Sequence, residues 1–151
     1  MPVSADDLTQ AFLRHRKVTQ QLCDLMPDAQ FGFKPWDGAM SFGALAVHLA
    51  NSADFYMAMA EGKEVTRPDP ASQPQTPADI RTYLAKKTDE QAARIGHLGG
   101  DLDRKVTARG HEVPLSLLLG QQREHEAHHK GQMLTMLRMR GNRDELFYAV
   151  R

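Results

Sequence analysis

The chain has 151 residues, a length that suits one domain, residues 1–151, built around a single hydrophobic core. Its 19 basic and 19 acidic side chains cancel, which argues against nucleic acid or an anionic membrane as a partner. The single cysteine, Cys23, excludes an internal disulfide, and no apolar run approaches the roughly 18 residues of a membrane span. The N-terminal segment lacks the apolar stretch of a signal peptide, so we expect a cytoplasmic protein.

The first predicted element is a helix that Ser4 caps and Pro27 ends. Apolar residues recur within it at steps of three and four, the spacing of one helix face. The predicted buried face consists of Leu8, Ala11, His15, Val18, Leu22 and Leu25. Residues 27–40 are rich in glycine and proline and are predicted to connect two helices. Three aromatic residues of this connection are expected to pack over the end of the fold: Phe31, Phe33 and Trp36.

Ser41 caps a second predicted helix, which ends near Glu61 and Gly62. Its predicted buried face consists of Leu45, His48, Ser52, Phe55 and Met59. Residues 63–77 contain four prolines among polar residues, and proline is poorly tolerated inside helices. This segment is therefore predicted to be a long crossover or an exposed loop.

A third helix is predicted from Pro77 to about Leu98, with Thr76 as its N-cap. Its buried side has apolar ends and a polar middle, and glycines break it near residues 96–100. Residues 101–113 are predicted to be irregular or to contain a short extended turn around Gly110.

Pro114 opens a fourth predicted helix, which Gly141 and Asn142 are expected to stop. Its predicted buried face consists of Leu115, Leu118, Gln122, His125, His129, Gln132, Met136 and Met139. Four amphipathic helices around one core predict an all-α fold, a four-helix bundle with a long crossover connection.

The fourth helix carries the most informative stretch of the chain, His125-Glu126-Ala127-His128-His129. On a helix, His125 and His129 lie only about 40° apart in rotation and about 6 Å apart along the axis. Two imidazoles so placed can bind one metal ion, and His48 on the second helix can supply a third ligand. A buried imidazole needs a hydrogen-bond partner or a ligand role, and a divalent ion would satisfy all three together.

Other assignments of these histidines stay open. His48 alone could be a hydrogen-bonded core residue, and His125 with His128 is an alternative ligand pair at i,i+3. Four further residues are expected to line the site or to orient its ligands: His128, His15, Gln132 and Ser52.

Two known metal motifs match in part. Residues 125–129 fit the H-E-x-x-H pattern of zinc proteases, but those enzymes need an edge strand to hold substrate, which the sequence does not predict. Glu126 and His129 fit one Glu-x-x-His pair of a di-iron bundle, but the first two helices carry no glutamate before Glu61. We therefore favour neither motif.

Two blocks of the sequence, residues 40–49 and 125–132, resemble the DinB/YfiT-like superfamily in residue type and in order. The likeness extends to Pro35 before the second helix and to Gly141 after the fourth. The resemblance implies a four-helix bundle with a long crossover, often dimeric. It also implies a divalent metal ion held by three histidines, which correspond here to His48, His125 and His129.

Characterised members of that superfamily are metal-dependent transferases or isomerases that act with low-molecular-weight thiols such as bacillithiol, mycothiol or glutathione. The resemblance therefore implies a homodimeric S-transferase that conjugates a thiol cosubstrate to electrophiles. One ion per chain is expected, with Zn²⁺ and Ni²⁺ as the leading candidates because imidazole suits both. Two other functions stay open: a metal-dependent hydrolase, and a metal-binding stress-response protein without turnover.

Overall fold

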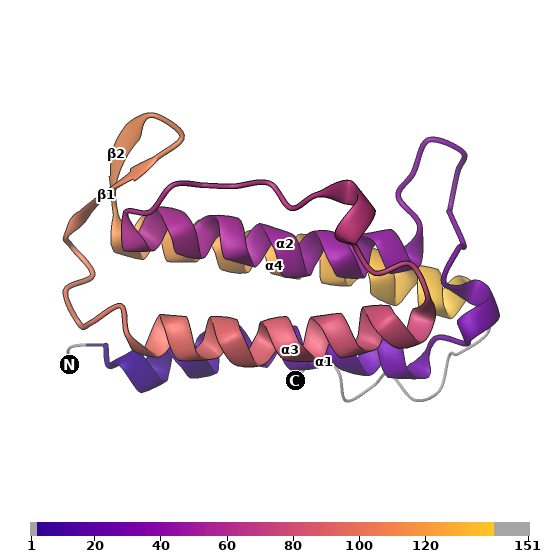
Figure 1. Ribbon diagram of the computed structural model, residues 1–151. Coiled ribbons are helices and arrows are strands. Elements are labelled where there is room, and N and C mark those ends of the chain that lie inside the picture. Colours follow the sequence, from indigo (N-terminus) through magenta and orange to yellow (C-terminus); the bar gives the residue numbers. More distant parts are fainter. Residues whose placement is uncertain (1–2, 141–151) are drawn as a thin grey trace.

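The computed structural model describes residues 3–140, which form four long helices and one small hairpin (Figure 1). The helices are α1 (Ala5–Leu25), α2 (Phe42–Glu61), α3 (Pro77–Gly96) and α4 (Leu115–Met139). The hairpin pairs β1 (Lys105–Ala108) with β2 (His111–Pro114), and the 3₁₀ turns η1 (Asp28–Gln30) and η2 (Pro70–Ser72) lie in connections. The predicted four-helix bundle is confirmed, with the hairpin as a minor addition. The predicted stop at Gly141 and Asn142 lies outside the described residues.

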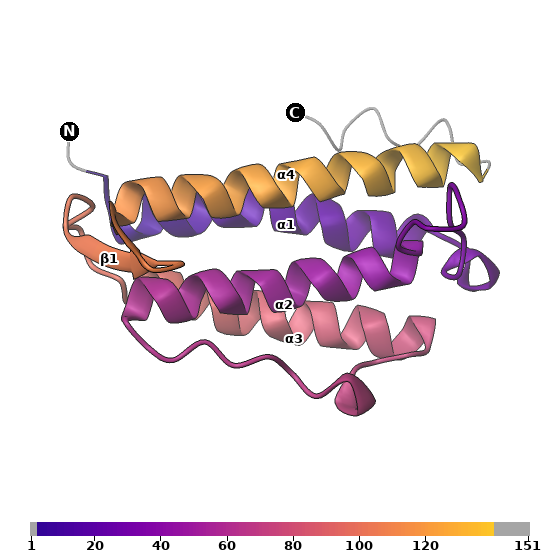
Figure 2. The ribbon, with the colours of Figure 1, turned by 90° about the horizontal axis from the view of Figure 1, so that it is seen from above.

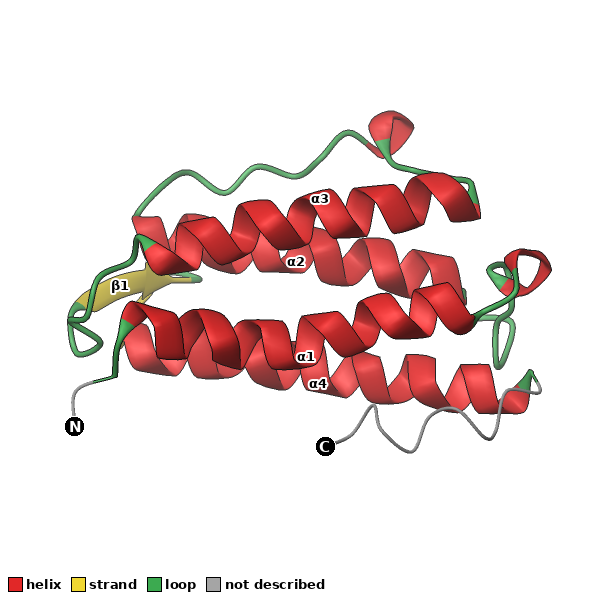
Figure 3. Cartoon of the chain, turned by 90° about the horizontal axis from the view of Figure 1, so that it is seen from below, coloured by secondary structure: helices red, strands yellow, loops and turns green. Residues whose placement is uncertain are grey.

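The helices form two layers, with α2 and α4 in one layer and α1 and α3 in the other (Figure 1). The neighbours of α1 are α3 and α4, and these two helices are also the neighbours of α2. Residues 62–76 run back along the bundle, so α3 begins at the same end as α2 and lies parallel to it (Figure 2). Seen from below, this crossover lies outside the helices (Figure 3). None of the helices described has both the length and the apolar character to cross a membrane.

Short polar side chains start three of the helices, as predicted. The Ser4 hydroxyl accepts the backbone N–H of Asp7, and the Asp7 carboxylate accepts the backbone N–H of Ser4, which makes a capping box. The Ser41 and Thr76 hydroxyls each accept the backbone N–H three residues further on. The second helix ends at Gly62, whose φ of 69° lies in the left-handed region that glycine adopts without strain.

The hairpin occupies the segment that the sequence leaves irregular. Its turn residues, Arg109 and Gly110, have φ values of 51° and 83°. Two positive φ values in a two-residue loop are typical of a type I′ turn, whose twist matches that of the two strands. Val106 pairs with Val113, and the buried Val106 side chain belongs to the core at this end of the bundle.

The buried face of α1 differs from the predicted one. It consists of Leu8, Phe12, Arg16, Thr19, Leu22 and Cys23, whereas the predicted His15 and Val18 are only half-buried. Both sets have helical spacing. The prediction selected the set without Arg16, because arginine is seldom fully buried.

In α2 and α4, as in α1, the observed buried face is rotated by about one residue from the predicted one. In α2 the core residue is Leu49, and His48 is half-buried beside it. In α4 the core residue is Glu126, and His125 and His129 are half-buried at its flank. The prediction that the histidines lie inside the core is therefore wrong, because Leu49 and Glu126 occupy the core positions.

The three aromatic residues of the connection between α1 and α2 differ in burial. Phe31 is buried and contacts Phe42 edge to face, with ring centroids 5.3 Å apart. Phe33 is half-buried, but Trp36 is 65% exposed. The prediction that Trp36 packs over the end of the bundle is therefore wrong.

An ion pair between Arg16 of α1 and Glu126 of α4 lies within the core, with 0% and 2% of the two side chains exposed. The Arg16 Nε and Nη2 atoms donate to the two Glu126 carboxylate oxygens at 2.8 and 3.0 Å, a bidentate geometry. Both charges are desolvated, so each needs the other and further polar partners.

Those partners come from α1, α2 and α3, so the network joins all four helices. Arg16 Nη1 donates to Gln91 Oε1 of α3 at 2.7 Å, and Nη2 donates to the Leu49 carbonyl of α2 at 3.1 Å. The Thr19 hydroxyl of α1 donates to Glu126 Oε1 at 3.1 Å. Within residues 3–140, no buried side-chain nitrogen or oxygen lacks a hydrogen-bond partner. The polar middle that the sequence shows in the third helix thus serves this network.

Removing one member of the pair should destabilise the fold, because the other charge then stays buried alone. We expect Glu126→Leu to lower the free energy of unfolding by roughly 3–5 kcal/mol, measured by urea denaturation at pH 7. The double variant Arg16→Met/Glu126→Leu should recover most of that loss, since it leaves no unpaired charge.

The matched control is the exposed pair of Lys86 and Glu90, whose charged atoms lie 3.9 Å apart. Lys86→Ala should leave the urea midpoint nearly unchanged, as solvated pairs contribute little. Wild-type stability of the Glu126→Leu protein would contradict the central role of the pair.

Candidate metal centre

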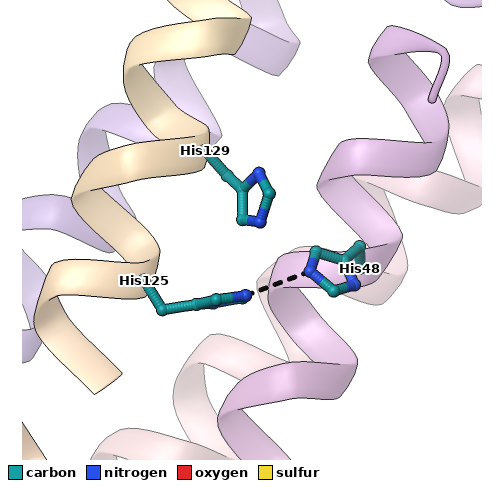
Figure 4. A group of neighbouring side chains, drawn as sticks. All are labelled: His48, His125 and His129. Carbon is teal, nitrogen blue, oxygen red and sulfur yellow. Dashed lines mark hydrogen bonds between the residues drawn. The ribbon is translucent and has the colours of Figure 1, made fainter. Parts of the chain in front are cut away.

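Three histidines from two helices converge between α2 and α4 (Figure 4). His48 of α2 faces His125 and His129 of α4, and one ring nitrogen from each lies within 4.8 Å of the others. The ring centroids are 5.0 Å apart for His48 and His125, and 4.8 Å apart for His48 and His129. His125 and His129 are one helical turn apart, so both rings face α2. The structure thus brings together the three histidines that the sequence analysis selected as ligands.

The spacing of two of the donor atoms fits one small ion. The Nε2 atoms of His48 and His125 lie 3.1 Å apart. Two nitrogens that bind one tetrahedral ion at 2.0–2.1 Å are about 3.3 Å apart, so these two need hardly move. Three imidazoles leave one position of a tetrahedral ion open for a further ligand. Imidazole donors suit both Zn²⁺ and Ni²⁺.

Two polar side chains contact the histidine rings from outside. Gln132 Oε1 lies 2.7 Å from His129 Nδ1 and, as an amide oxygen, can only accept the Nδ1 proton. In the neutral ring this contact places the proton on Nδ1 and leaves the Nε2 lone pair for a metal. Ser52 Oγ lies 3.5 Å from both ring nitrogens of His48, at the outer limit of a hydrogen bond.

The surroundings keep two of the imidazoles neutral. Burial lowers the pKa of His125 to about 4, and the neighbouring His129 and His48 contribute to the same shift. Burial also lowers the pKa of His48, with a further contribution from His129. A neutral imidazole is the form that binds metal, so both lone pairs are available at pH 7.

The other two histidines singled out from the sequence are not members of this cluster. His128 is exposed, with its ring centroid 4.8 Å from that of His129. His15 lies between α1 and α4, where Lys130 Nζ donates to its Nδ1 at 2.9 Å. Burial lowers the pKa of His15, and Lys130 adds to the effect. His15 is therefore not one of the residues that converge on His48.

A pocket of about 600 Å³ opens beside His129, and we name it the Trp36 pocket. One wall is the loop that holds Trp36 and Met40, and the other is the α4 surface with Gln132, Met136 and Met139. This pocket was not predicted, because Trp36 was expected to pack over the end of the bundle. The available signal was the pair of apolar residues, Trp36 and Met40, in a loop rich in glycine and proline.

Glu126 has no part in the cluster, although it belongs to the H-E-x-x-H pattern. Its carboxylate is buried in the core and accepts hydrogen bonds from Arg16 and Thr19. The protease pattern needs this glutamate as a general base beside the metal. The geometry therefore argues against a zinc protease.

The family model of the DinB superfamily matches residues 11–133. The chain belongs to the DinB superfamily. The match includes all three converging histidines and confirms the resemblance that the two sequence blocks indicate.

Relatives of this DinB chain include YjoA of Bacillus subtilis (strain 168), which is 28% identical over 152 residues. The alignment covers 97% of this chain and 97% of YjoA. The crystal structure of YjoA, a DinB-like protein, has a TM-score of 0.76 and covers 91% of this chain and 93% of its own. The crystal structure of a DinB-like protein from Bacillus cereus ATCC 10987 is 20% identical in sequence and has a TM-score of 0.79. The match covers 93% of this chain and 95% of the Bacillus cereus chain. The crystal structure of a protein from Exiguobacterium sibiricum 255-15, described as a member of the DinB family, is 21% identical and has a TM-score of 0.69. The match covers 95% of this chain and 97% of the Exiguobacterium chain. The last two likenesses concern the fold alone.

The depressed pKa values predict a pH dependence of stability for the metal-free protein. A histidine has a pKa near 6.5 when unfolded and about 4 at His125 when folded, so between these values the unfolded state binds more protons. The free energy of unfolding should therefore fall as the pH is lowered through this window. In EDTA, His125→Gln should lose less stability than wild type between pH 7 and pH 4.5.

The control for this comparison is His111→Gln, which replaces an exposed histidine of the hairpin. Its melting temperatures should follow those of wild type across the same pH range. Equal pH slopes for wild type and His125→Gln would contradict the depressed pKa of His125.

Proposed function

We propose that this DinB protein is a metal-dependent S-transferase that conjugates a low-molecular-weight thiol to electrophiles. The observation that carries the proposal is a cluster of three converging imidazoles at the edge of an apolar pocket, on the flank of the core. His48, His125 and His129 would hold one divalent ion, with Zn²⁺ and Ni²⁺ as the candidates. When bound, such an ion lowers the pKa of a thiol that reaches its open position, and the thiolate is the reactive form.

The chain's own side chains support an external thiol as the nucleophile. Cys23 is the only cysteine, and it is buried in the core. Burial raises the pKa of the Cys23 thiol to about 12, so it stays protonated and unreactive at pH 7. Ser52 lies beside His48, but its contact at 3.5 Å is too long for an efficient proton transfer to that ring.

The cluster's position on the flank of the core also favours a reaction over structural metal binding. The three histidines are half-buried, so their outer side is reachable by small molecules. A structural ion is normally enclosed by four protein ligands, whereas three leave a position for a substrate. Gln132 holds the His129 ring in the tautomer that keeps Nε2 available.

The ligand assignment predicts separable effects of four substitutions. Replacing His48, His125 or His129 by Ala should weaken Zn²⁺ binding by at least about 100-fold, measured by competition with a chelator, because only two ring ligands remain. Gln132→Ala should cost about 10- to 100-fold, as expected for a side chain that orients a ligand.

The matched control is His128→Ala, which removes an exposed histidine next to His129 and should leave the metal stoichiometry unchanged. If His128→Ala emptied the site while His129→Ala kept it full, the ligand pair would be His125 with His128. Full stoichiometry in the His125→Ala protein would exclude the assignment altogether.

The proposed activity is tested by conjugation of several thiols, glutathione among them, to 1-chloro-2,4-dinitrobenzene. Metal-loaded wild type should accelerate product formation below the pKa of the free thiol, near 8–9. In His129→Ala the thiol keeps its ordinary pKa, so the residual rate should rise with pH through that range.

Two further outcomes separate the alternatives. Metal-dependent cleavage of p-nitrophenyl acetate without any thiol conjugation would favour a hydrolase. Tight metal binding with neither reaction would favour a binding protein.

A further inference from the structure

Exposed apolar side chains gather at one end of the bundle, beside the histidine cluster. Three of the large hydrophobic residues most open to solvent in residues 3–140 are Trp36, Met40 and Met139, which are 65%, 42% and 54% exposed. All three line the Trp36 pocket. Single exposed apolar side chains are ordinary, but several around one concave surface mark a binding site.

The lining of this pocket is apolar and without formal charge. Leu45, Met136 and Ala39 add apolar surface, and the polar contribution comes from Gln132, Thr135 and the edges of His128 and His129. No carboxylate, ammonium or guanidinium group lies among the lining residues in the part of the chain that the structure describes. A charged ligand would lose hydration here without gaining an opposite charge, which disfavours its binding. An uncharged ligand carries no such cost.

The pocket is continuous with the histidine cluster. His129 lines the pocket on one side and faces His48 on the other, and Gln132 both lines the pocket and accepts the His129 Nδ1 proton. A molecule in the pocket therefore lies against the residues that would position a metal-activated thiol. Its volume of about 600 Å³ falls within the range of small-molecule sites, about 300–1,000 Å³.

We propose that the Trp36 pocket binds the electrophile, and that it selects uncharged, mainly apolar or aromatic molecules. This inference rests on the proposed S-transferase function. In the reaction with a chloroarene, the thiolate sulfur bonds to the ring carbon and chloride leaves with the electrons of the carbon–chlorine bond. The thiol proton passes to solvent, so the net products are the thioether, chloride and a proton.

Trp36 makes the pocket directly observable, because it is the only tryptophan of the chain. The probe is N-phenyl-1-naphthylamine, an uncharged aromatic molecule that accepts energy from a nearby tryptophan. Its matched partner is 8-anilinonaphthalene-1-sulfonate, which has the same ring system and adds one sulfonate. The metal-free protein should bind the uncharged probe one to one, at least about tenfold more tightly than the sulfonate.

Two variants place a charge on opposite walls of the pocket, Met40→Glu on the loop and Met139→Glu on α4. Each should weaken binding of the uncharged probe by at least about tenfold while leaving the melting temperature unchanged, since both side chains are exposed. The matched control is Leu117→Glu on α4, which replaces a residue 49% exposed that does not line the pocket. Wild-type affinity in both wall variants would overturn the proposal.

Inhibition of conjugation separates this inference from the proposed function. If the pocket holds the electrophile, the uncharged probe should compete with 1-chloro-2,4-dinitrobenzene, and Met40→Glu should raise KM more than it lowers kcat. Conjugation that the probe does not inhibit would overturn the pocket assignment and leave the transferase intact. Probe binding without conjugation at any metal loading would overturn the transferase, and the pocket would stand as a site for uncharged ligands.

A second copy of the chain is the competing occupant. In that case probe binding per chain should decrease as the protein concentration rises, and Met40→Glu should convert a dimer to a monomer in light scattering. Either result would overturn the proposal, whereas a probe stoichiometry independent of protein concentration supports it.

Discussion

The buried pair of Arg16 and Glu126 sets the rotation of the helices on which the histidine cluster depends. With Glu126 directed at the core, helix geometry places His125 about 100° to one side and His129 about 60° to the same side. His128 then lies about 160° from the core direction, which is where the structure shows an exposed side chain. The choice of Glu126 as the core residue therefore decides which histidines can meet α2 and which one cannot.

The second helix has the same arrangement around Leu49, whose carbonyl accepts from Arg16. His48 lies about 100° from Leu49, on the side that corresponds to His125 in α4. Flanks of the same hand meet across two helices only when the helices are antiparallel. The views show α2 and α4 running in opposite directions, while the crossover 62–76 makes α2 parallel to α3 (Figure 2). The long crossover is thus a condition for the histidine cluster, because it determines which neighbours of α2 are antiparallel to it.

Much of this fold follows from local signals in the sequence. The caps at Ser4, Ser41 and Thr76 and the stop at Gly62 determine helix boundaries, and the prolines of residues 63–77 determine the crossover. The convergence of the histidines was also predictable, since two lie one turn apart and the third lies on another amphipathic helix. These features depend on residue type and spacing alone, which a single sequence contains.

The rotation of the helices was not predictable in the same way. Two stripes with helical spacing exist in α1, and only the tertiary partner of Arg16 selects between them. A sequence shows Arg16 and Glu126 as two charges 110 residues apart, and nothing local states that they pair. For each helix taken alone, a histidine in the core and a charged residue at the surface is the less costly arrangement. The pairing of Arg16 with Glu126 across helices makes the opposite arrangement the stable one.

The position of the histidines at the flank of the core, and not within it, affects which molecules can reach the cluster. Had the histidines been in the core, an ion would be enclosed by packed side chains, and no substrate could reach its remaining position. Because the ion pair holds the core, the imidazoles lie at its flank, where burial is sufficient to lower the pKa values of His48 and His125 and the outer side stays open. The core network and the candidate site thus use different faces of α4: Glu126 joins the four helices, while Gln132 contacts His129 and both residues line an apolar pocket. The proposed function needs such access, because a thiol and an uncharged electrophile must both reach the site from solvent.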